Sequence, residues 1–209
     1  MKYIEFLDQL QKDRYFVFSI QDMLILFPKT KKKTILNQLT EWCKRGYIIR
    51  LKKNLYEIAQ QGTVGGFEIT DLFIANKLYV PSYVSLETAL SVYNIIPEVA
   101  FGVTSVTTNP TKKFKNKHGQ FWYHSCKPEA YTGYLLADYE GFKVAIAEKE
   151  KALVDYIYFK TRGERKLSLE EERFDEDILK ELDWQKMMRY AKLFNKRLVK
   201  TVREMRRVF

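Results

Sequence analysis

The sequence predicts an α+β fold in two parts, and three observations support this prediction. Apolar residues recur at helical spacing up to residue 45, and two short β-rich runs then follow up to residue 58. Residues 59–66, AQQGTVGG, are rich in glycine and are typical of a linker. Beyond them, helical and strand-like apolar periods alternate. We therefore expect a first domain at residues 1–61 and a second, mixed α/β domain at residues 67–209.

Two helices are predicted at the start of the first domain. The first covers residues 2–11, where aromatic and leucine residues recur at helical spacing. Ser19 begins the second, because it precedes an apolar run and Asp22 follows three residues later, where unpaired N–H groups favour an acid. Pro28 ends this helix, since the residue before a proline avoids helical angles.

A third helix follows, with Thr30 as its expected N-cap and Gly46 as its left-handed end. One arc of this helix is apolar and is expected to be buried; it comprises Ile35, Leu36, Leu39, Trp42 and Cys43. The opposite arc is polar and comprises Thr30, Lys33, Thr34, Asn37, Glu41 and Lys44, with Lys31 and Gln38 beside it. The polar arc is expected to face solvent or a ligand.

Two β-rich runs, residues 47–51 and 55–58, flank a basic turn and predict a hairpin. Two helices followed by a glycine and a basic hairpin, in this order, are typical of a winged helix-turn-helix. A helix face of Lys, Thr and Asn suits a DNA major groove, and the hairpin tip suits a phosphate or a minor groove. The expected DNA-binding residues are Thr30, Lys31, Lys32, Lys33, Thr34, Asn37, Gln38, Arg50, Lys52, Lys53 and Asn54. The alternative is a small helical domain with a solvated basic face.

The second domain is predicted to mix helices and strands. Helices are expected at residues 67–77, 86–94, 148–160 and 184–207, and strands at 103–107, 111–115, 120–126 and 142–146. Ser85 is the expected N-cap of the helix at 86–94. The turn Asn116-Lys117-His118-Gly119 is expected to join the second and third strands as a hairpin.

The net charge of +10 is unevenly distributed. Residues 1–61 and 184–209 are basic, whereas residues 62–183 have a small acidic excess. Two basic ends suggest a polyanion partner that contacts both, although a membrane surface is an alternative for the last helix. The expected secondary basic surface comprises Lys112, Lys113, Lys115, Lys117, Lys196, Arg197, Lys200 and Arg203. The acidic segment 170–183 is the other candidate partner of the last helix.

Other classes of protein are less well supported by the sequence. No apolar run is long enough to cross a bilayer, and the N-terminus lacks the apolar core of a signal peptide. Cys43 and Cys126 are far apart and form no CxxC motif, which favours a reducing cytoplasm. His118 and His124 lack the spacing of metal ligands. We expect no membrane association, no metal and no cofactor.

One stretch invites a catalytic interpretation. Glu148-Lys149-Glu150-Lys151, with Asp155, is similar to the acid and lysine mixtures of metal-dependent nucleases. On a helix, however, Lys151 and Asp155 are expected to form an ordinary surface pair. We therefore expect no catalytic residue and no enzyme.

Several blocks, in order, resemble one family. They are KRGYIIRLKKNLYEI, YVPSYVSLETALSVYNIIPE, VTSVTTNPTKKF, GQFWYH and FKVAIAEKEKALVDYIY, which together span about residues 30–158. The chain resembles the AbiEi-type antitoxins of type IV toxin–antitoxin systems, which act in abortive infection, a form of phage defence. The resemblance implies a winged helix, an α/β antitoxin domain and autorepression at a double-stranded operator with inverted repeats. It also implies that the chain opposes a nucleotidyltransferase-like toxin from a neighbouring gene.

The resemblance covers no motif beyond about residue 160, so it implies nothing about the role of the basic last helix. Two alternatives stay open. One is an enzyme that acts on nucleic acid or nucleotides and is targeted by the winged helix. The other is a ligand-sensing transcriptional regulator, which a sizeable apolar pocket between Tyr83 and Tyr158 would support.

Overall fold

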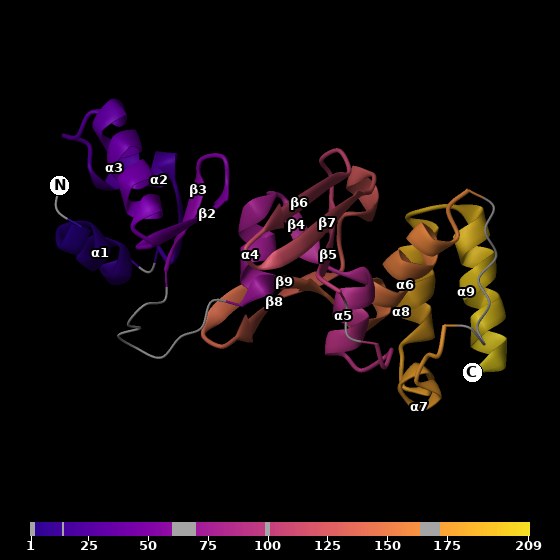
Figure 1. Ribbon diagram of the computed structural model, residues 1–209. Helices are drawn as coiled ribbons and strands as arrows, with labels where there is room; N and C mark the ends of the chain where they lie inside the picture. Colours follow the sequence, from indigo (N-terminus) through magenta and orange to yellow (C-terminus); the bar gives the residue numbers. More distant parts are fainter. Residues whose placement is uncertain (1–2, 14, 60–69, 99–100, 164–171) are drawn as a thin grey trace. The chain divides into compact units, whose positions relative to one another are not determined.

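The computed structural model describes residues 3–13, 15–59, 70–98, 101–163 and 172–209 (Figure 1). The chain divides into two compact units, each of which mixes helices and strands. The first comprises Met1–Thr70 with the turn Asn116–His118, and the second comprises Asp71–Lys115 and Gly119–Phe209. The expected domain boundary and nearly all of the Gly-rich stretch lie outside the described residues. The first three residues of the helix expected at 67–77 also lie outside them.

The first unit contains three helices and a small antiparallel sheet. Its elements are α1 (Tyr3–Lys12), β1 (Val17–Ser19), α2 (Ile20–Leu26), α3 (Lys32–Lys44), β2 (Ile48–Lys52) and β3 (Leu55–Ile58). The strand order is β1-β3-β2, so β1, ahead of the helix pair, pairs with the second strand of the hairpin. The predicted helices and hairpin are present, with shifts of one or two residues at their ends.

Aromatic side chains fill the core of the first unit. The ring of Phe6 lies 5.4 Å from that of Phe18 and 4.4 Å from that of Trp42, measured between centroids. All three side chains are buried, and Ile35 and Leu39 are buried with them. Rings from α1, β1 and α3 therefore join the helices to the sheet.

Local signals place the start of α2 and the end of α3 as expected. The Ser19 hydroxyl accepts a hydrogen bond from the Asp22 amide at 3.2 Å, and the Asp22 carboxylate accepts one from the Ser19 amide at 2.6 Å. Gly46, with φ of +73°, follows the end of α3. Its amide donates to the Cys43 carbonyl, and the Tyr47 amide donates to the Trp42 carbonyl, which completes a Schellman motif.

The second unit is built on a six-stranded mixed sheet. Its first elements are α4 (Asp71–Leu78), β4 (Ser82–Val84), α5 (Leu86–Val92), β5 (Val103–Thr107), β6 (Lys112–Asn116) and β7 (Gly119–Ser125). A short 3-10 turn (Pro128–Ala130), β8 (Tyr134–Tyr139), β9 (Phe142–Ala147), α6 (Lys149–Lys160), α7 (Glu176–Lys180), α8 (Trp184–Lys192) and α9 (Lys196–Val208) follow. The strand order is β6-β7-β5-β4-β9-β8, with parallel pairs β5/β7 and β4/β9. β4 and β8 were not predicted from the sequence.

Strand register assigns the helices to the two faces of the sheet. Tyr123 pairs with Ser105, and its hydroxyl donates to the Ala75 carbonyl of α4 at 2.6 Å. Tyr83 pairs with Val106, the next residue along β5, and its side chain reaches α6. Because successive side chains alternate between faces, α4 covers one face and α6 the other.

Helix α6 is buried on almost every side, and it contains an ion pair with no solvent exposure. Lys151 and Asp155 contact each other one helical turn apart. The Lys151 ammonium also donates to the Tyr83 hydroxyl at 2.8 Å. Asp155 Oδ2 accepts from the Tyr83 hydroxyl at 3.0 Å and from the Ser85 hydroxyl at 2.9 Å. The expected surface pair is therefore wrong, because Lys151 and Asp155 lie on a side of α6 that the rest of the unit covers.

This pair also changes how α5 begins. Ser85 is the N-cap, as expected, but its hydroxyl donates to Asp155 and makes no capping bond. The Thr104 hydroxyl on β5 caps the helix instead, because it accepts a hydrogen bond from the Thr88 amide at 3.1 Å. A side chain distant in sequence thus replaces the local cap.

The single helix expected at residues 184–207 is two helices, α8 and α9. Asn195 begins α9 by accepting from the Leu198 amide at 2.8 Å, which separates it from α8. Phe194, between the helices, packs against Tyr158 and lies 5.0 Å from the Lys151 ammonium, measured to its ring centroid. The segment after Asp183 therefore covers the buried ion pair.

We expect Asp155→Asn to destabilise the protein by about 3–5 kcal/mol, because it leaves the Lys151 ammonium buried without a counter-charge. The Asn oxygen can still accept from Tyr83 and Ser85, so the lost charge dominates. Adding Lys151→Met should recover most of the loss. Urea unfolding of both variants measures this, and a double variant less stable than Asp155→Asn would contradict it.

Candidate nucleic-acid interface

The turn between α2 and α3 is closed by backbone hydrogen bonds. The Phe27 amide donates to the Met23 carbonyl, and the Thr30 amide donates to the Phe27 carbonyl at 3.0 Å. Thr30 is not the N-cap that we expected. Lys31 holds that position, and its side chain makes no capping bond. The first turn of α3 contains no acid, so its N-terminal dipole faces only basic and neutral side chains.

The predicted outer face of α3 is exposed in the structure. Lys31, Lys32, Lys33, Thr34 and Asn37 are exposed, as are Glu41 and Lys44 further along the helix. Thr30 and Gln38 are half-buried. The helix therefore presents lysine, threonine and amide groups on one side near its N-terminus.

The predicted inner face of α3 is largely correct. Ile35, Leu39 and Trp42 are buried, and Cys43 is half-buried. Leu36 is the exception, with 36% of its surface exposed. It lies at the edge of the apolar arc and faces the start of α2 instead of the core.

The hairpin tip is Lys53-Asn54, not the expected three residues from Lys52. Lys52 pairs with Leu55 inside the ladder and is half-buried. Asn54 adopts a left-handed conformation with φ of +66°, which asparagine tolerates in tight turns. Its carbonyl accepts from the Ile20 amide at 3.2 Å and so holds the tip against the start of α2. Arg50 is exposed on β2, and its Nε donates to the Lys52 carbonyl at 3.4 Å.

The structure brings α3 and the hairpin tip to one hollow of about 330 Å³. Lys32 and Leu36 of α3 line it together with Asn54 of the hairpin. Ser19, Ile20 and Gln21 complete its lining. Gln21 and Leu36 were not among the predicted binding residues, because nothing in local spacing indicates that the start of α2 adjoins the hairpin.

The lysines of the β6–β7 hairpin are exposed: Lys112, Lys113, Lys115 and Lys117. β6 is an edge strand of the sheet, and lysines on such a strand discourage pairing with other chains. The Lys112 ammonium lies over the rings of Tyr79 and Phe114, 5.5 and 5.2 Å from their centroids. Part of this basic surface is thus explained by local packing.

The basic residues of α9 lie opposite its buried side. Lys196, Arg197, Lys200 and Arg203 are exposed. Leu198, Val202 and Met205 are buried. Among the described acids of residues 172–183, Glu172 pairs with Lys160, Asp177 with Lys180, and Asp183 with Arg189, all outside α9. Glu170 and Glu171 lie outside the described residues.

Three of the residues considered for catalysis, Glu148, Lys151 and Asp155, form ion pairs within the second unit. Lys151 and Asp155 have no exposed surface, so a substrate cannot reach them. Glu148 accepts from the Tyr190 hydroxyl at 2.5 Å and pairs with Lys186 at 3.0 Å, which joins α6 to α8. Burial opposes ionisation of Glu148, but the hydrogen bonds from Tyr190 and Lys186 bring its pKa below the usual value.

Comparison with known proteins gives no identification: no protein-family model matches this chain, and no curated protein is significantly similar to it in sequence. Within the described residues, no cluster of three or more His, Cys, Asp or Glu could hold a metal ion. The helices of the described part are too short or too polar to cross a membrane.

We expect Trp42→Ala to cost about 3–5 kcal/mol of stability, because it removes a large buried ring that packs on Phe6. Lys44→Ala, on the exposed side of the same helix, should change stability by less than about 0.5 kcal/mol. Urea unfolding compares the two. A folded Trp42→Ala protein that has lost nucleic-acid binding would instead place Trp42 on the outer face.

Proposed function

We propose that this chain is a DNA-binding transcriptional autorepressor and antitoxin of a type IV toxin–antitoxin system, active in the cytoplasm. In this proposal the first unit is a winged helix-turn-helix, with α3 in the major groove and the β2–β3 hairpin as the wing. The observation that supports it best is the placement of the exposed α3 face beside the hairpin tip. Lys32 and Asn54 line the same hollow there.

The chemistry of the two elements suits a duplex. Exposed lysines at the start of α3, with the helix dipole, favour a phosphate. Asn37 lies one to two turns into the helix, and an asparagine amide can pair with the edge of an adenine. Lys53 and Arg50 on the hairpin add charge beside the groove. Phosphate contacts would position the protein, and Thr34 and Asn37 would select the sequence.

The antitoxin role rests on the resemblance to AbiEi-type antitoxins and is tested separately. The partner it implies is a nucleotidyltransferase-like toxin from a neighbouring gene. Coexpression should restore the growth of cells that produce this toxin. A toxic neighbour that the chain does not oppose would contradict the antitoxin role but leave DNA binding intact.

DNA binding should depend steeply on salt. If Lys31, Lys32, Lys33, Lys52 and Lys53 contact phosphates, log K should fall with log salt at a slope of roughly −4 to −5. Fluorescence anisotropy with a duplex selected from a random pool measures this slope. An affinity that barely changes between low and moderate salt would contradict the proposed interface.

Asn37→Ala should weaken binding to the selected duplex by about 1–3 kcal/mol and change binding to random duplexes little, because a base contact is lost. Thr40→Ala is a matched control on the same helix, since the Thr40 hydroxyl already donates to the Leu36 carbonyl. Competition between the selected and a random duplex provides the measurement. Equal losses on both would exclude Asn37 from base recognition.

We also propose that α9 extends the DNA contact. Removal of the segment after Asp183 is a poor test, because α8 and α9 cover the buried ion pair. Lys196→Ala with Arg203→Ala should instead make the salt slope shallower by about 1–2 and shorten the protected DNA in footprinting. Lys127→Ala with Lys149→Ala removes the same charge elsewhere and is the control. Identical slopes and footprints for both double variants would leave α9 a purely structural helix.

A further inference from the structure

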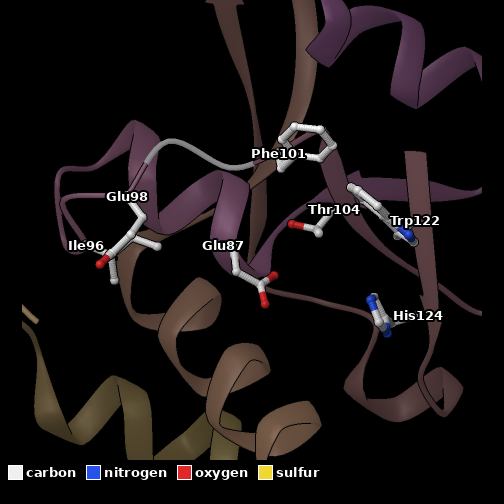
Figure 2. A pocket seen from close by; sticks show the side chains of 8 residues that line it. Glu87, Ile96, Glu98, Phe101, Thr104, Trp122 and His124 are labelled. Atoms are coloured by element: carbon white, nitrogen blue, oxygen red, sulfur yellow. The ribbon is translucent and has the colours of Figure 1, made fainter. Parts of the chain in front are cut away.

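The second unit contains a pocket of about 430 Å³ (Figure 2). Tyr83 is fully buried beside Asp155, and Tyr158 packs on Phe194; neither residue lines this pocket. The pocket lies instead beside α5, and its volume falls within the range of about 300–1,000 Å³ typical of small-molecule sites. Its lining comprises Glu87, Ile96, Glu98, Phe101, Gly102, Thr104, Trp122 and His124.

The sheet explains why these side chains converge. Thr104 pairs with Trp122, and Val106 with His124, so Trp122 and His124 lie on the same face as Thr104. Thr104 is hydrogen-bonded to Thr88 of α5, which places this helix on that face. Trp122 and His124 are on β7, one strand further out than β5, and thus stand beside α5.

Glycine at position 102 lets the indole of Trp122 lie against the backbone. A Cβ at Gly102 would lie 2.5 Å from Cζ3 of Trp122, which is too close for any side chain. The neighbouring Phe101 is 86% exposed at the rim of the pocket. Two aromatic rings, those of Phe101 and Trp122, therefore border the pocket.

Three polar groups at the pocket have no hydrogen-bond partner or ion pair in the part of the chain that the structure describes. They are the Glu87 carboxylate, the Trp122 indole N–H and the ring nitrogens of His124. Figure 2 shows the Glu87 carboxylate and the His124 ring on opposite sides of the hollow. Thr104 is different, because its hydroxyl already donates to the Ser85 carbonyl and accepts from the Thr88 amide.

The charges around the pocket are polarised. Glu87 and Glu98 lie on one side, and Glu98 is paired with Arg173 at 3.3 Å. Near His124, the exposed Lys113 and Arg162 supply positive charge. Burial lowers the pKa of His124. The Glu87 charge acts in the opposite direction, and the two cations lower the pKa further. The imidazole is therefore neutral at pH 7 and offers one donor and one acceptor.

A ligand that fits is planar, has N–H donors at one end and is anionic at the other. A carboxylate has two oxygens and pairs best with two adjacent N–H groups. Among the standard nucleobases, only guanine has two such groups side by side, N1–H and the N2 amino group. Its O6 and N7 are acceptors, which suit the imidazole N–H of His124.

We propose that this pocket binds a free guanine nucleotide. Glu87 accepts hydrogen bonds from N1–H and N2–H, Trp122 and Phe101 pack against the base, and Lys113 and Arg162 face the phosphate. This site shares no residue with the proposed α3 interface. It would make the chain a regulator that responds to guanine nucleotides.

Isothermal titration calorimetry on the full chain without DNA tests the proposal. GMP and GDP should bind at least tenfold more tightly than AMP, CMP and UMP. Glu87→Gln should remove this preference, because an amide presents only one acceptor. Glu129→Gln, an exposed glutamate outside the pocket lining, should leave it unchanged. Trp122→Leu should weaken every guanine nucleotide and gives a second test if Glu87→Gln fails to fold.

Other outcomes would overturn the proposal. The absence of GMP and GDP binding at millimolar concentration would do so, as would equal binding of all the nucleotides with no effect of Glu87→Gln. Binding of agmatine without binding of GMP would show that the pocket takes a guanidinium cation instead. Because these titrations contain no DNA, their failure would not affect the proposed α3 interface, and the failure of DNA binding would not affect them.

Discussion

The second unit depends on the buried ion pair between Lys151 and Asp155. Removing two charges from water costs several kcal/mol for each ion, and only close geometry with further hydrogen bonds offsets this cost. Tyr83 and Ser85 provide those bonds from the β4 segment, 68–72 residues earlier in the chain. These bonds link α6 directly to β4 and to the residue that follows it. The ion pair also explains why Ser85 does not cap α5.

The same constraint gives α8 and α9 two roles. Phe194 lies over the Lys151 ammonium, and the buried side of α9 packs within the unit, so this segment shields the ion pair from water. The other side of α9 is left with exposed lysines and arginines, whose mutual repulsion favours a negatively charged partner. A structural helix pair can in this way also be a cationic surface.

The two candidate binding surfaces differ in chemistry. The α3 face and hairpin tip combine lysines with threonine and asparagine, a set that suits phosphates and base edges. The pocket beside α5 combines Glu87 with aromatic rings and a neutral imidazole, which suits a planar ligand with N–H donors. The Glu87 carboxylate in its lining makes it a poor site for the backbone of a duplex. The second unit thus contains a candidate site whose chemistry differs from that of the α3 face.

Features that depend on neighbours along the chain could be predicted from the sequence. Ser19 with Asp22 predicted the start of α2, Gly46 predicted the end of α3, and the spacing of Leu39 and Trp42 predicted its buried side, because caps and helical periodicity are local. Tertiary structure alone decided which residues from distant segments meet. β8 had no distinctive apolar pattern. The four-residue spacing of Lys151 and Asp155 is the same on an exposed helix as on a buried one, so it does not reveal burial. The pocket, likewise, exists only because strand register places β7 beside α5, a long-range contact that no local spacing encodes.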